Sequence, residues 1–461
     1  MPALLALLLP AAHAVVLTSD TLPIRVDCDD ADLAAEALAF SEEQWEIQVE
    51  GMGFAPPLMV DDTGAVAEGF DLQLPDLGQG VVATFEVLGD HPATPQSDCP
   101  VLSLVNSYYM GQNGWLEMSV VHLLNHASLH AVDCLEPQMP SFDTFSVAIE
   151  VLTGHAAFWS HYIAEFQAMP YQSIDKWFGM GSTAYYQFGS ALFALFLDDR
   201  YGAGDGALLA ELWSYSAQDG TITGGDGEFA TGDVENEPDY LDAIDLGLRD
   251  NGASLDEAWV AFSAARWFVG TNDDGAHITG AGAWSGGEPF VDSAWTAADL
   301  PLVDQPAAET MAEYSSSFMT FAVEPAPGME LLLEITGSDA VAWGGTALAL
   351  QDGASATEHP LEMSDAAHGR VRVPLEEGLT GVVLSVAALG DGAHDPEDHD
   401  VNRDYDYAVS ASLVEAAPED TGAPETPADE GGCACSSTHT GWAGLFPALL
   451  GLLGLALHRR R

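Results

Sequence analysis

The spacing of apolar residues changes near residue 305, and this change limits the possible folds more than any other feature of the 461-residue chain. Before that point, apolar residues recur every three or four positions over long stretches, as they do on one face of a helix. After it, short alternating or apolar runs are separated by Gly, Asp and Pro, which is typical of a β-sandwich. The pattern predicts an α+β domain over residues 15–300 and an all-β sandwich domain over residues 305–414.

Each domain has its own set of expected elements. In the first we expect helices over residues 32–49, 116–131, 146–166, 183–200, 205–216 and 254–268, and strands over 70–74, 81–87 and 100–109. In the second we expect strands over residues 318–323, 330–335, 346–350, 371–374, 382–387 and 407–413. The Gly- and Asp-rich residues 217–240 are interpreted as a loop.

The N-terminal residues have the pattern of an export signal. An apolar run over residues 3–9 is followed by Ala12, His13 and Ala14, which fit the small-x-small pattern of a cleavage site. We therefore expect residues 1–14 to be a signal peptide and the mature protein to begin at Val15.

The C-terminal end carries a linker and an anchor. Residues 415–432 are rich in acids and prolines and predict an extended, solvated linker. Cys433 and Cys435 follow, then an apolar run over residues 441–457 that barely spans a bilayer, then three Arg residues. This order fits a plain single-pass tail anchor, and it also resembles the myxobacterial C-terminal sorting signal. The resemblance implies that residues 433–461 are a sorting signal with a transmembrane helix, and that the protein stays at the cell surface or outer membrane through Cys433 or Cys435.

The charge balance excludes two classes of partner. The chain has 72 Asp and Glu residues against 11 Lys and Arg residues, a net charge of −61. Nucleic acids and anionic lipids are bound through basic surfaces, which such a chain does not provide. The expected partners are the cell envelope, through the anchor, and an extracellular protein or polysaccharide ligand.

The cysteines agree with export. Cys28, Cys99 and Cys134 precede the anchor, and three cysteines allow one disulfide in any of three pairings. We favour Cys99 with Cys134, because these two residues flank one expected strand-and-helix segment.

The expected helix over residues 116–131 carries the densest chemistry. His122, His126 and His130 recur every four residues and therefore share one face. Two histidines at this spacing can chelate zinc, as in the His-Glu-x-x-His proteases, but the Glu position is Leu123 here. His155 on the next expected helix is a candidate third ligand. The alternative is that these histidines are hydrogen-bonded structural residues.

The first domain resembles the myxobacterial putative metalloprotease family, which has a zincin-like fold and a His-Glu-x-x-His helix. The similarity spans roughly residues 25–285, and the segments that carry it are 41–57, 60–64, 69–74, 121–127, 157–159, 191–202 and 267–277. The resemblance aligns the family's general base with Leu123 and its third metal ligand with Gly154. Leu123 cannot accept a proton, and Gly154 has no side chain to bind a metal. His122 and His126 remain, and His155 lies beside the lost ligand.

These departures predict a degenerate zincin-like domain with a binding or structural role and without hydrolytic activity. One alternative is an active zinc metallopeptidase that uses His122 and His126 with a substitute third ligand such as His155. Another is a surface adhesin that acts through the β-sandwich. We expect no cofactor, with zinc as the candidate if one is bound. For the acidic residues 272–275 and 398–404, a solvated turn is favoured over a calcium site. The second segment has Arg403 where calcium loops need Gly.

Overall fold

A computed structural model describes most of residues 15–416. The residues outside the description are 1–14, 90, 92, 95, 111–113, 135, 137–138, 157, 177, 179–184, 218–237, 285, 353, 391–403 and 417–461. The expected signal peptide, nearly all of the linker and the sorting signal therefore lie outside the described residues. Among the helices of the described part, none is long and apolar enough to cross a membrane.

A mixed five-stranded sheet forms the N-terminal part of the fold. Its strand order is β1-β2-β5-β7-β6, with β2, β5 and β7 parallel and the two edge strands antiparallel to their neighbours. The bounds are β1 Val15–Thr18, β2 Ile24–Cys28, β5 Phe70–Leu74, β6 Ala83–Val87 and β7 Val101–Val105. A separate hairpin pairs β3 (Leu58–Val60) with β4 (Val66–Glu68). The three strands expected here are confirmed, although β7 ends earlier than expected.

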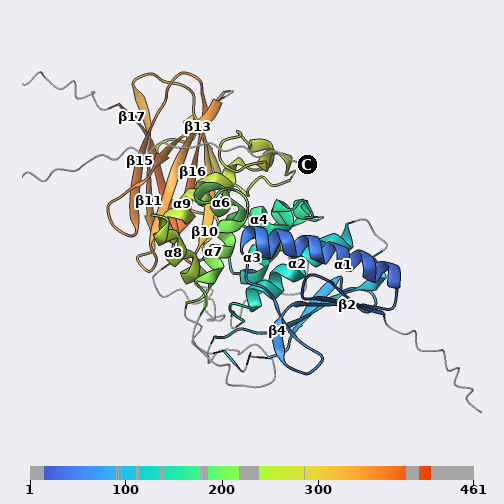
Figure 1. Cartoon of the computed structure of the whole chain (residues 1–461). Coiled ribbons are helices and arrows are strands. Elements are labelled where there is room, and N and C mark those ends of the chain that lie inside the picture. The colour runs from blue at the N-terminus through green and yellow to red at the C-terminus, as the bar shows by residue number, and fades with distance from the viewer. Residues whose placement is uncertain are drawn as a thin grey trace, which may run out of the picture. The chain divides into compact units, whose positions relative to one another are not determined.

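Helices α1 (Ala31–Trp45) and α2 (Trp115–His130) pack on this sheet and against each other. Figure 1 shows α1 beside α2 and α3 (Met139–Leu152). Leu123, Leu124 and Ala127 of α2 belong to the same hydrophobic cluster as Leu72 and Val101 of the sheet. The opposite face of α2, which carries the histidines, is thereby directed toward α3.

The remaining helices surround a second hydrophobic core. Their bounds are α4 Trp159–Ala168, α5 Tyr186–Gly189, α6 Ala191–Tyr201, α7 Ala207–Ser214, α8 Tyr240–Asp250 and α9 Leu255–Ala265. The single helix expected over residues 146–166 is wrong, because α3 ends at Leu152 and Gly154 then adopts a left-handed conformation, with φ of 80°. The helix expected over residues 183–200 is likewise divided into α5 and α6.

Two five-stranded sheets form the C-terminal part. Their strand orders are β13-β12-β16-β10-β8 and β14-β15-β11-β17-β9. The bounds are β8 Ser293–Thr296, β9 Leu302–Pro306, β10 Ser315–Ala322, β11 Met329–Gly337, β12 Trp343–Gln351, β13 Ala354–Pro360, β14 Glu362–Met363, β15 His368–Pro374, β16 Leu379–Ala388 and β17 Tyr407–Glu415. Side chains from both sheets, such as Phe321, Leu384 and Leu333, share one hydrophobic cluster. The fold is therefore α+β, as expected.

The first of these sheets also contacts the helical part. Helix α9 packs on β12 and β16, and the Trp259 indole donates a hydrogen bond of 3.1 Å to the Ser315 carbonyl. The expected boundary near residue 300 falls within this sheet, since β8 pairs in parallel with β10.

Candidate metal centre

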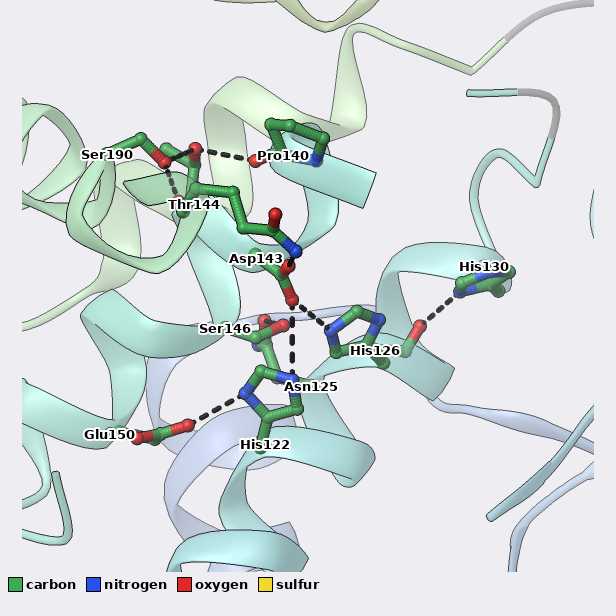
Figure 2. A network of polar contacts seen from close by, with 11 residues as sticks. His122, Asn125, His126, His130, Pro140, Asp143, Thr144, Ser146, Glu150 and Ser190 are labelled. Atoms are coloured by element: carbon green, nitrogen blue, oxygen red, sulfur yellow. Dashed lines mark hydrogen bonds and ion pairs between the residues drawn. The ribbon is translucent and has the colours of Figure 1, made fainter. Parts of the chain in front are cut away.

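Helices α2 and α3 bring two histidines and two carboxylates face to face. His122 and His126 are one turn apart on α2, and Asp143 and Glu150 are two turns apart on α3. Figure 2 shows Asp143 between the two imidazoles, with Glu150 on the far side of His122. The four side chains thus form one polar cluster at the helix–helix contact.

Asp143 is the centre of this cluster. Its Oδ1 atom lies 3.5 Å from Nε2 of His122 and 3.3 Å from Nε2 of His126. Its Oδ2 atom accepts a hydrogen bond of 3.1 Å from the Gln187 side-chain amide. Glu150 pairs with the other nitrogen of His122, with 2.7 Å between Oε1 and Nδ1.

The cluster is nearly closed to solvent. The side chains of His126, Asp143 and Glu150 are at most 3% exposed, whereas that of His122 is 18% exposed. His122 therefore forms the solvent-facing edge of the cluster.

Burial and the neighbouring carboxylates act in opposite directions on His122. Burial lowers the pKa of His122, but hydrogen bonds to Asp143 and Glu150 outweigh burial and raise it. Burial lowers the pKa of His126, and the adjacent charge of His122 lowers it further. Burial raises the pKa of Glu150. One imidazole is thus held in its charged form beside a neutral one.

The donor atoms fit a zinc ion. Nε2 of His122, Nε2 of His126 and a carboxylate oxygen of Asp143 lie within 4.8 Å of one another. A tetrahedral zinc ion with bonds of about 2.0–2.1 Å separates its ligand atoms by about 3.3 Å, which matches the two distances from Asp143. Two imidazoles and one carboxylate are also a common ligand set of zinc sites with an open position.

The charges fit a divalent cation as well. If both carboxylates were ionised and only His122 protonated, the four side chains would carry one excess negative charge in a nearly closed site. A divalent ion in place of the Nε2 proton would neutralise it. His122 would keep its Nδ1 proton directed at Glu150, the arrangement in which a carboxylate orients a metal-bound histidine.

His155, the expected third ligand, is not among the residues that the structure brings together here, and Asp143 is the third member of the group. His155 lies in the turn after α3, and its ring packs edge-on against Phe40 with 5.1 Å between centroids. Gly154, which has no side chain to bind a metal, lies in the same turn. Leu123 is 1% exposed and packs toward the sheet.

His130 shares the face of α2 but is a structural residue. Its Nδ1 donates to the His126 carbonyl at 2.7 Å, and its ring stacks on Phe142 with 4.2 Å between centroids. Burial lowers its pKa, so the ring is neutral.

Asp143 was not predicted from the sequence, since it precedes the helix expected over residues 146–166.

A disulfide joins Cys99 to Cys134, with 5.8 Å between their Cα atoms, and Cys28 is free and buried. The Cys99 amide donates to the His130 carbonyl at 2.9 Å. The bridge therefore fastens the C-terminal end of the histidine helix to the segment before β7.

The aspartates of residues 272–275 make the side-chain-to-backbone hydrogen bonds of a turn. The Asp273 and Asp274 carboxylates accept from the backbone amides of Gly275 and Ala276 at 2.9 and 3.0 Å. Of the other calcium candidate, residues 398–404, only Asp404 lies within the described residues.

No protein-family model matches the chain, and a search of curated proteins finds no match either.

Proposed function

We propose that this protein binds one divalent metal ion of the zinc class between α2 and α3, through His122, His126 and Asp143. The observation that carries the proposal is the convergence of three ligand atoms within 4.8 Å in a cluster with little exposure to solvent. Glu150 is proposed to orient His122 from the opposite side of its ring.

We further propose that the metal serves binding or structure and that the domain is a degenerate, zincin-like relative of the metallopeptidases. A peptidase needs a base beside the metal-bound water. Leu123 cannot be that base and packs toward the sheet. Glu150 contacts Nδ1 of His122, which is on the far side of the ring from the Nε2 ligand atom. An active metallopeptidase is the alternative, supported by the ligand set alone.

The setting proposed for this domain is the cell surface. The N-terminal pattern of residues 1–14 supports export, and the order of Cys433, Cys435, apolar run and Arg cluster supports anchoring to the envelope. The two C-terminal sheets with a shared core support a β-sandwich that lies between the metal domain and the anchor in the sequence.

Metal content and hydrolysis together test this function. Residues 15–430 contain all the described residues of the compact unit that ends at Ala416. After dialysis against zinc and gel filtration, we expect about one zinc per chain, lost in His126→Ala and kept in His155→Ala. We also expect no cleavage of an unstructured protein substrate. Chelator-sensitive cleavage would overturn the non-catalytic role, and a zinc-free wild type would overturn the metal site.

A further inference from the structure

Six aromatic side chains form a continuous row that ends at the metal cluster. Successive ring centroids are 5.1, 5.6, 4.8, 6.4 and 4.9 Å apart, and the last ring lies 6.4 Å from that of His122. In order, this aromatic row consists of Tyr108, Tyr109, Trp115, Phe158, Tyr162 and Phe188.

The row is accessible over most of its length. Tyr108 is 52% exposed, Tyr162 is buried and the other four are half-buried. Tyr185, which contacts Tyr162 and is 43% exposed, widens the row near the cluster. Partly exposed aromatic rings that touch one another in a row are more typical of an interaction surface than of scattered surface residues.

The surroundings of the row are acidic. Segments 76–80, 106–110, 114–117, 158–165 and 185–188 carry the rings or contact them, as the Gly80 amide does by donating to the Tyr109 hydroxyl at 2.9 Å. These segments contain Asp76, Glu117 and Glu165 and no Lys or Arg. Aromatic faces attract cations, and the net charge of −61 raises the local concentration of cations around the whole protein.

We propose that the aromatic row is the docking surface for an extended, Arg- or Lys-bearing segment of an extracellular protein. In an extended peptide, alternate side chains point the same way and lie about 6.6 Å apart, which is farther than the 5.1 and 5.6 Å between the first three rings but within the reach of flexible Arg and Lys side chains. Cationic side chains would stack on Tyr108, Tyr109 and Trp115, and the peptide would run toward His122. This inference goes beyond the metal site and does not depend on it.

A synthetic peptide tests the proposal directly. The probe is a blocked ten-residue peptide of alternating Arg and Gly, titrated calorimetrically into residues 15–430. We expect binding that weakens at least about tenfold between 50 and 300 mM salt, since the attraction is electrostatic. Tyr108→Ala, at an exposed site, should weaken it about threefold, and Trp115→Leu, which keeps the apolar bulk, about fivefold or more.

Three controls keep the outcome decisive. Phe290→Ala removes an aromatic residue of 40% exposure outside the row and should leave binding unchanged. Asp143→Asn should weaken zinc binding strongly and leave peptide binding within twofold, which separates this inference from the metal site. The proposal is overturned if the peptide does not bind, if Phe290→Ala weakens binding as much as Trp115→Leu, or if a neutral hexasaccharide of N-acetylglucosamine binds more tightly than the peptide.

Discussion

Two histidines in the described part of the chain each lie between two carboxylates, yet their surroundings differ. His122 contacts Asp143 and Glu150 at the contact of two helices. His277 contacts Asp274 and Glu358, with 2.8 Å to Nδ1 and 3.0 Å to Nε2, where a loop meets strand β13.

The difference lies in the second imidazole. His126 shares Asp143 with His122, so two nitrogens and one oxygen converge. His277 instead stacks on Phe268 with 3.7 Å between ring centroids, and both of its nitrogens are occupied by carboxylates. A pair of carboxylates around one histidine therefore makes an ion-pair contact, whereas a carboxylate shared by two histidines brings together three atoms that could hold a metal ion.

The largest effect should come from removing the shared carboxylate. Asp143→Ala takes one of three ligands from the site, and we expect zinc affinity to fall at least about 100-fold. Asp274→Ala, the matched change at His277, should leave zinc affinity unchanged. Competition with a chromogenic chelator measures both. Equal losses in the two variants would remove the distinction between the sites.

Removing the metal should lower the stability of the wild type and not that of a variant without Asp143. An ion that binds the folded state at 100 times its dissociation constant adds about 2.7 kcal/mol to the free energy of unfolding. We expect a chelator to lower the thermal midpoint of the zinc-loaded wild type and to leave that of Asp143→Ala unchanged. A chelator-induced decrease of the same size in Asp143→Ala would place the metal elsewhere.

The sequence predicts half of this site. The period of four residues correctly places His122 and His126 on one face of α2, and the favoured Cys99–Cys134 pair is the one joined in the structure. Asp143 could not be predicted, because the sequence pattern of α2 does not reveal which residues of α3 pack against its histidines. His155 was expected on a helix, whereas the left-handed Gly154 follows the end of α3 and precedes it.

Secondary structure was likewise predicted where the local sequence pattern is clear and missed where it is not. Alternation predicts the strand over Phe70–Leu74, because its alternate apolar side chains belong to one hydrophobic cluster with residues of α1 and α2. Helix α8 was missed, although Asp239 caps it by accepting from the amides of Leu241 and Asp242 at 2.7 and 2.9 Å. The acidic, Gly-rich segment before this helix obscured the capping signal.

A smaller, pH-dependent effect on the free energy of unfolding should come from His277. Burial lowers its pKa, but hydrogen bonds to Glu358 and Asp274 outweigh burial and raise it above the ordinary value of 6.5. The stabilisation is therefore fully present below pH 6.5 and is lost as pH rises through the folded-state pKa. The hydrogen bond from His277, and to a smaller extent the charge of Arg200, lowers the pKa of Glu358.

We expect His277→Gln to lose about 1 kcal/mol of unfolding free energy at pH 6, since Glu358 is half exposed, and progressively less at higher pH. Urea unfolding from pH 6 to 9 measures the difference between wild type and variant. A difference that grows with pH would contradict the assigned sign.

The smallest effect concerns the expected third ligand. His155→Ala removes a ring that packs on Phe40 and lies outside the metal cluster, so zinc affinity should change less than twofold. Zinc competition at neutral pH measures it. A tenfold loss would restore His155 as a ligand.

The most direct test of the metal centre is X-ray absorption at the zinc edge on zinc-loaded residues 15–430. The account predicts two imidazoles and one or two further oxygen ligands, at about 2.0–2.1 Å. Removal of Asp143 should change the oxygen shell and leave the two imidazoles. Three imidazoles, a sulfur ligand or no bound zinc would contradict the assignment of His122, His126 and Asp143 as the metal centre.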